Sequence, residues 1–155
     1  MNSCPRCVLS TRKCGLEMKL DIHLHFQGNC RQALDFYGNI FGVSPEGLVT
    51  YGDAPADPSQ PLPEGYAENI LHSALEIAGI RVMLSDGFPG WQGIAGNQVT
   101  LSLNFNNTAQ AETMFKALQQ GGEVHMPLTK TFFSEAYGML TDQFGVLWHI
   151  AVMAS

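Results

Sequence analysis

The chain has 155 residues, of which 45% are hydrophobic and 14% charged, and its formal net charge is −6. This length predicts a single domain that buries about two-thirds of its unfolded surface. From Leu20 onward there are four basic and thirteen acidic residues (4 − 13 = −9), which argues against a nucleic-acid partner. No apolar run approaches the ~20 residues of a membrane span, and no secretory signal precedes the domain, so we expect a cytoplasmic protein.

Residues 1–17 are expected to form a disordered tail ahead of a single domain at 18–155. Three of the four cysteines lie in this tail, at Cys4, Cys7 and Cys14. Structural zinc usually takes four thiolate or imidazole ligands, and the single C-x-x-C pair at residues 4–7 has no matching second pair. The composition therefore favours an unstructured segment over a metal site.

The first half of the domain predicts a strand, a helix and a strand hairpin. Residues 18–26 alternate between apolar and polar side chains, as a half-buried strand does. Asn29 is the expected N-cap of a helix over residues 30–41, which Gly42 ends. Residues 43–68 are rich in proline and glycine and contain a short strand at 48–51; a binding-site lid and a mobile surface loop both remain open. Strands at 69–77 and 80–85 meet in a tight turn at 78–79.

The second half begins after a glycine-rich loop at residues 86–97. A strand is expected at 98–105 and a helix at 109–120, with Thr108 as its cap. Another strand starts at 123–126. The chain closes with a hairpin, whose apolar runs at 136–140 and 146–152 flank a turn containing Asp142 and Gly145.

The two halves repeat. The helix stripes superimpose with a shift of 78 residues, and the preceding strands superimpose with a shift of 79, as for Phe26 and Phe105. Each half, 18–87 and 98–155, then reads strand–helix–strand–strand–strand, one supersecondary unit used twice. We expect two curved sheets that face each other across a cleft. In the last strand Leu147, His149 and Ala151 share one face, which places His149 in that cleft.

Several short motifs follow one another in a characteristic order. They are Phe26-x-Gly28-Asn29-Cys30, Ala33-Leu34-Asp35-Phe36-Tyr37, His72-x-Ala74, Ser85-Asp86, Thr131-Phe132-Phe133, Gly138, Thr141-Asp142, Phe144-Gly145-Val146 and Trp148. From about Lys19 to its end the chain resembles PhnB-like proteins of the glyoxalase/bleomycin-resistance (vicinal oxygen chelate) superfamily. The resemblance implies an α+β fold of paired βαβββ modules, with curved mixed sheets enclosing a cleft, and it suggests a homodimer.

Members of that superfamily commonly hold a divalent metal with side chains from four strands. Carried over with the helix motifs as anchors, the four positions fall near Ile22, Met83, Thr100 and His149. Only His149 has a good metal-binding side chain, and a shift of one residue, which would bring in His23, still leaves the set incomplete. We therefore predict no cofactor; if a metal binds, His149 is its ligand.

His149 is the candidate catalytic residue, as a hydrogen-bonding group or general base, with a structural core histidine as the alternative. The candidate binding residues share a position at a strand end, in a loop or on a strand face near the cleft. They are His72, Asp86, Met83, Trp91, Phe132, Phe133 and Tyr137. Each has a structural alternative: a sheet histidine, a turn cap, or an ordinary core side chain.

The favoured function is binding of a small apolar or aromatic molecule in the cleft without a complete metal site. The first alternative is a metal- or histidine-dependent lyase, isomerase or dioxygenase. The second is an antibiotic-binding protein of the bleomycin-resistance type. Related sequences often carry the label 3-demethylubiquinone methyltransferase, but the chain shows neither a doubly wound sheet pattern nor a glycine-rich nucleotide turn to support it.

Overall fold

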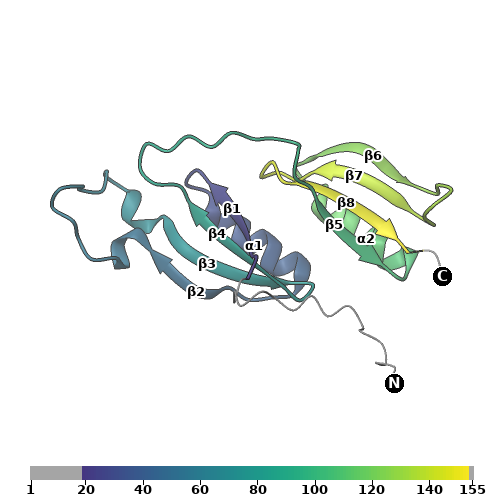
Figure 1. Cartoon of the computed structure of the whole chain (residues 1–155), viewed down its shortest axis with the longest axis horizontal. Coiled ribbons are helices and arrows are strands. Elements are labelled where there is room, and N and C mark those ends of the chain that lie inside the picture. Colours follow the sequence, from purple (N-terminus) through teal and green to yellow (C-terminus); the bar gives the residue numbers. More distant parts are fainter. Residues whose placement is uncertain (1–18, 154–155) are drawn as a thin grey trace, which may run out of the picture.

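The computed structural model describes residues 19–153, which form two four-stranded sheets and two α-helices (Figure 1). The expectations for the tail at 1–17 fall outside these residues. The first module contains β1 (Ile22–Phe26), α1 (Cys30–Phe41), β2 (Glu46–Thr50), β3 (Ile70–Ile77) and β4 (Ile80–Asp86). The second contains β5 (Leu101–Phe105), α2 (Thr108–Leu118), β6 (Glu123–Thr129), β7 (Tyr137–Thr141) and β8 (Leu147–Val152). None of the described helices has the length and apolar character needed to cross a membrane.

The two modules have the same topology, which confirms the repeat. The strand order is β1-β4-β3-β2 in the first sheet and β5-β8-β7-β6 in the second. The first strand of each module pairs in parallel with the last, and the remaining pairs are antiparallel. In these registers His23 lies opposite Met83, and Ser102 lies opposite His149. Directly paired residues share a sheet face, so each pair occupies one face of its own sheet.

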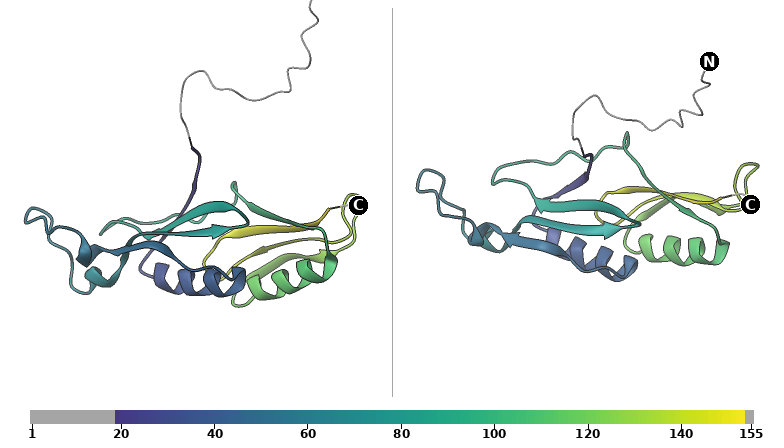
Figure 2. Two further views of the ribbon diagram at one scale, coloured as in Figure 1. Left: turned by 90° about the horizontal axis from the view of Figure 1, so that it is seen from below. Right: turned by 60° about the horizontal axis from the view of Figure 1, so that its bottom comes forward.

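The sheets lie side by side within the chain instead of facing each other. Both helices cover the same side of the molecule, and the opposite side of each sheet carries no helix (Figure 2). The reason is a single core that receives the apolar stripes of both helices. Tyr37 of α1 lies 5.8 Å from Phe144 and 6.1 Å from Trp148 of the second module, measured between ring centroids. The sheet surface without helices is called the open face below.

The helix positions agree with the sequence, but both N-caps differ from expectation. Asn29 precedes α1 without a capping hydrogen bond from its side chain. The carboxylate of Asp86 at the end of β4 instead accepts from Cys30 N, the first N–H of the helix, at 3.1 Å, and from Gly28 N, just before the helix, at 2.8 Å. In α2 the cap is Asn107, whose side chain accepts from Gln110 N at 3.2 Å; Thr108 is the first helical residue.

Candidate functional site

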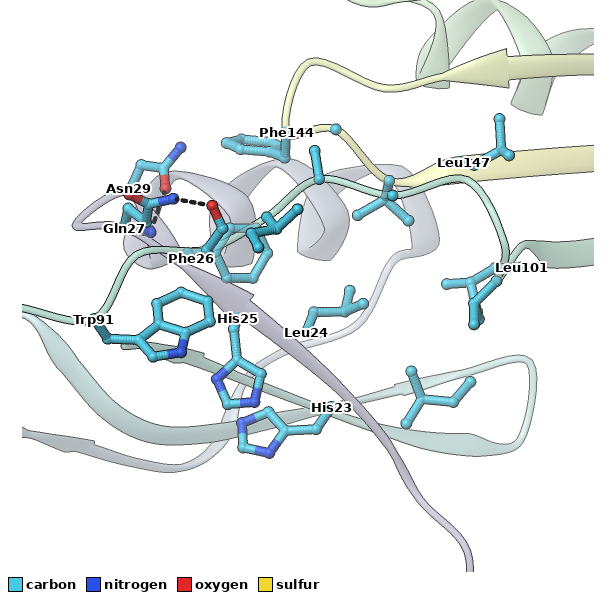
Figure 3. Close-up of a pocket in the computed structure, with 18 residues that line it drawn as sticks. His23, Leu24, His25, Phe26, Gln27, Asn29, Trp91, Leu101, Phe144 and Leu147 are labelled. Carbon is cyan, nitrogen blue, oxygen red and sulfur yellow. Dashed lines mark hydrogen bonds between the residues drawn. The ribbon is translucent and has the colours of Figure 1, made fainter. Parts of the chain in front are cut away.

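A cleft of about 610 Å³ lies at the seam between the two modules (Figure 3). One wall is β1, and the other is formed by the start of β5 and the turn between β7 and β8. The loop between β4 and β5 runs along the cleft and contributes lining residues from Trp91 to Val99. The lining residues are Ile22, His23, Leu24, His25, Phe26, Gln27, Asn29, Trp91, Gly93, Ile94, Ala95, Gly96, Val99, Leu101, Phe144, Gly145, Val146 and Leu147. Most are apolar, so the cleft suits a ligand with an apolar or aromatic body.

Trp91 is the candidate from the sequence that lines this cleft, and two glycines hold its indole in place. A Cβ atom at Gly87 would come within 2.7 Å of Trp91 Cδ2, and one at Gly93 within 2.8 Å of Trp91 Cη2. The indole lies with its centroid 5.5 Å from the ring of His25 (Figure 3). Only residues without a side chain at 87 and 93 allow this position. The tryptophan is 41% exposed, which leaves its ring accessible to a ligand.

Replacing Gly87 with alanine is therefore expected to move Trp91 out of the cleft. Since the indole can swing toward solvent, the free energy of unfolding should fall by only about 1 kcal/mol. The indole N–H resonance of Trp91 should shift strongly in a ¹H–¹⁵N spectrum, while that of the buried Trp148 stays in place. Gly96→Ala is the matched control, because a Cβ there meets no atom within 4 Å. An unchanged Trp91 resonance in Gly87→Ala would show that the position of the indole does not depend on the missing side chain at Gly87.

Histidines gather on the open face of the first sheet beside the cleft. The rings of His23 and His25 are stacked, with centroids 4.0 Å apart and an interplanar angle of 23°. His23 Nε2 lies 2.8 Å from the hydroxyl of the buried Ser85. Burial, and then the neighbouring imidazoles of His25 and His72, lower the pKa of His23 below its ordinary value. Met83 is directly opposite His23 in the adjacent strand, so the candidates Met83 and His72 lie on this face without lining the cleft.

Asp86 is not among the residues that line the cleft, and its carboxylate binds backbone N–H groups. Besides the two N–H groups at the start of α1, it accepts from Ile70 N at 2.9 Å, and the residue is only 3% exposed. Tyr51 donates to its carbonyl oxygen at 3.0 Å, and Tyr66 donates to the carbonyl of Gly87. The 51–69 segment thus fixes the start of the loop that carries Trp91. In the single chain Asp86 is a structural cap, not a ligand-facing group.

The remaining candidates form a second group on the other sheet. His149 Nδ1 lies 2.8 Å from the hydroxyl of Tyr137, whose ring packs at 5.2 Å against Phe133, which in turn packs against Phe132. Because Trp148 and Ile150 are buried in the core, the alternation of β8 turns His149 to the open face. It does not line the seam cleft. The Tyr137 hydroxyl fixes the orientation of an imidazole that can exchange a proton with a molecule on that face.

These residues do not fit a divalent metal. The sequence placed the four positions near Ile22, Met83, Thr100 and His149. The sheet registers correct two of them, because the residues opposite Met83 and His149 are His23 and Ser102, so the set supplies two imidazoles, a thioether and a hydroxyl. Nowhere between residues 19 and 153 do three histidine, cysteine, aspartate or glutamate side chains come together in a group able to hold a metal ion. Hard divalent cations prefer carboxylates, which are missing from this set.

Sequence reasoning did not single out most of the lining residues. Ile94 and Val99 lie in an irregular loop, where no periodicity marks an inward face, and they are 95% and 80% exposed. Phe144 lies in the turn between β7 and β8, where a side chain ordinarily faces solvent. The alternation of β1 does place His23 and His25 on one strand face, at a spacing that two ligands could use, with surface histidines as the alternative. No local signal could show that this strand forms the seam with the second module.

The chain was also compared with known proteins. The family model described as 3-demethylubiquinone-9 3-methyltransferase matches residues 18–151. Protein YjdN of Escherichia coli is 30% identical over 142 residues, which cover 88% of this chain and 96% of that protein. The crystal structure of protein PA1353 from Pseudomonas aeruginosa has a TM-score of 0.77 and 33% identity and covers 89% of this chain and 99% of that one. A putative 3-demethylubiquinone-9 3-methyltransferase, PhnB protein, from Bacillus cereus has a TM-score of 0.73 and 24% identity, covering 87% and 99%.

Proposed function

Since the chain belongs to the PhnB-like family of the vicinal oxygen chelate superfamily, matched by the 3-demethylubiquinone-9 3-methyltransferase model, we propose that it binds a small aromatic or apolar molecule in the seam cleft. The observation that supports this is the accessible indole of Trp91, which packs against Gly87 and Gly93 in a cleft lined mostly by apolar residues. Aromatic rings and aliphatic side chains recognise such ligands by contact area, with a few polar groups for orientation.

The proposal is binding without a resident metal and without methyl transfer. Its metal part rests on the donor set, in which a thioether and a hydroxyl occupy positions where carboxylates or imidazoles would be needed. The absence of methyl transfer rests on the lining, which offers apolar contacts and four polar side chains, those of His23, His25, Gln27 and Asn29. The family's description names a reaction, but a fold hosts unrelated chemistries and the site has to supply them.

Binding can be followed through the two tryptophans, because Trp91 lines the cleft and Trp148 is buried. Uniformly ¹⁵N-labelled protein is titrated with a panel of aromatic fragments that includes trans-cinnamyl alcohol and 2-naphthalenemethanol. We expect a saturable shift of the Trp91 indole resonance and a constant Trp148 resonance. Val99→Gln should weaken binding about 3- to 10-fold through lost apolar contact, and Leu48→Gln, outside the cleft, should not. Absence of a saturable shift with every fragment would reject the proposal.

We further propose that the protein is a cytoplasmic homodimer whose second copy covers the open faces. Large apolar side chains are left exposed in the single chain, including Phe132 at 100% and Leu20 at 94%. Exposed apolar surface of this kind often marks an interface between subunits. Size-exclusion chromatography with light scattering should give about twice the chain mass of 16.9 kDa. A mass equal to one chain across a range of protein concentrations would contradict the dimer.

A further inference from the structure

The seam cleft lacks acidic side chains, although the chain as a whole is acidic. The sequence has 14 aspartate and glutamate residues against 8 lysine and arginine residues. Among the 18 residues that line the cleft, the polar side chains are His23, His25, Gln27 and Asn29. Two of the four can carry a positive charge and none can carry a negative one. A negatively charged ligand would therefore meet no like charge in contact range.

The imidazoles at this end of the cleft have no acidic partner of their own. His25 makes no hydrogen bond or ion pair within residues 19–153, and its ring lies between those of His23 and Trp91. The same strand face carries Asp21, but its carboxylate is 3.3 Å from Lys19 and 3.6 Å from Arg81. Of the other acids paired in this sheet, Glu76 is opposite Arg81, and Glu46 is opposite Ala74 on β2, which β4 and β3 separate from β1. Asp86 is opposite Phe26, and its carboxylate accepts from three backbone N–H groups.

The hydrogen-bonding capacity of these imidazoles is only partly used. His23 Nε2 is occupied by the Ser85 hydroxyl at 2.8 Å, which fixes the ring and leaves Nδ1 available. His25 has both ring nitrogens available, and at least one of them carries a hydrogen in either tautomer. His72 lies on the same face, near enough for its imidazole to lower the pKa of His23. The free ring nitrogens of His23 and His25 thus lie at a cleft whose lining contains no carboxylate.

We propose that the ligand of the seam cleft is an aromatic or apolar acid, whose anionic group is bound by His25 and His23 while its apolar body packs against Trp91. This inference rests on the proposed function, since it names the chemical class of the molecule bound there. A carboxylate accepts charge-assisted hydrogen bonds from imidazole, and these are about twice as strong as bonds between neutral groups. The apolar body of the ligand occupies the part of the cleft lined by Leu24, Leu101 and Phe144.

The test compares trans-cinnamate with trans-cinnamyl alcohol, which have the same ring and chain but differ in charge. Both are titrated at pH 6.5, low ionic strength and excess EDTA, with the Trp91 indole resonance as the readout. We expect cinnamate to bind about 5- to 10-fold more tightly than the alcohol, as one charge-assisted bond in a partly exposed site would provide. His25→Phe keeps a ring on the strand and should remove this preference, measured as the ratio of the two affinities within the same variant. His125→Phe, on the second sheet, is the matched control.

Each result decides a different question. Equal affinity of cinnamate and the alcohol, or an unchanged preference for cinnamate in His25→Phe, would overturn the anionic ligand and leave the proposed function standing. Saturable binding of neither compound, nor of any other fragment, would reject the proposed function itself. Cinnamate binding that appears only when EDTA is omitted would also overturn the inference, because a metal ion would then bridge the carboxylate and the imidazoles.

Discussion

Replacing Asp142 with alanine is expected to lower the free energy of unfolding by about 3–5 kcal/mol. Asp142 is 3% exposed and lies in the turn between β7 and β8. One carboxylate oxygen accepts from Tyr37 Oη at 2.5 Å and Trp148 Nε1 at 2.9 Å. The other accepts from the backbone N–H groups of Phe144 and Val146. Alanine would leave two buried side-chain donors without an acceptor, and each such group costs about 1–3 kcal/mol.

The Tyr37 bond also joins the two modules, because the tyrosine belongs to α1 and the aspartate to the second hairpin. Urea denaturation followed by circular dichroism gives the stabilities. Tyr37→Phe removes one donor together with its need for an acceptor, so it should cost only about 1–2 kcal/mol. Asp35→Ala, at an exposed position on α1, should cost less than about 0.5 kcal/mol. A cost for Asp142→Ala as small as that of Asp35→Ala would show that the turn does not depend on the buried carboxylate.

The same network predicts a loss of stability at alkaline pH. Burial, and then the Asp142 carboxylate, raise the pKa of Tyr37 above its usual value of 10.0. The folded protein therefore retains a proton that the unfolded chain loses. The contribution of the protonated Tyr37 to the free energy of unfolding is fully present below pH 10 and declines as the pH rises above 10. Tyr37→Phe should flatten this decline in urea midpoints measured between pH 8.5 and pH 11.

The repeat made the fold predictable from sequence, because side-chain spacing reports the local structure directly. The apolar stripe around Tyr37 recurs 78 residues later, and both helices form where it predicts them. The turn at Ala78 and Gly79 adopts positive φ angles of 50° and 78°, as a two-residue hairpin requires. These features depend on residues close together in the chain.

The position of the cleft was not predictable in the same way. Alternation in β8 correctly places His149 and the buried Trp148 on opposite faces of the strand. It does not show which strands of the two modules lie next to each other. The seam exists because Tyr37 and Phe144 pack into one shared core, a contact between residues more than a hundred positions apart. Asp86 shows the same limit: it follows a strand as binding carboxylates often do, and only the structure reveals the backbone groups it binds.

Asp86 is the second position where a substitution is expected to lower the free energy of unfolding strongly. Its two carboxylate oxygens bind different N–H groups, so their contributions can be measured separately. Oδ1 accepts from Gly28 N and Cys30 N, and Oδ2 accepts from Ile70 N. Asp86→Ala removes the acceptor for all three N–H groups and should lower the free energy of unfolding by about 2–4 kcal/mol. Asp86→Asn keeps one oxygen for the start of α1 and loses the bond to Ile70, so about half that loss is expected.

The effect of Asp86→Asn on cinnamate affinity shows whether Asp86 caps the helix or binds the ligand. In Asp86→Asn the turn at Gln27 and Gly28 keeps its anchor, so the cinnamate affinity of the folded protein should stay within about 2-fold of the wild type. Unfolding in urea and the Trp91 titration provide the two readouts on the same sample. Asp57→Asn, in the exposed loop, controls for the loss of one negative charge. A loss of cinnamate affinity of 10-fold or more at full stability would instead place the Asp86 carboxylate in the binding site, because a cap can affect the ligand only through the fold it supports.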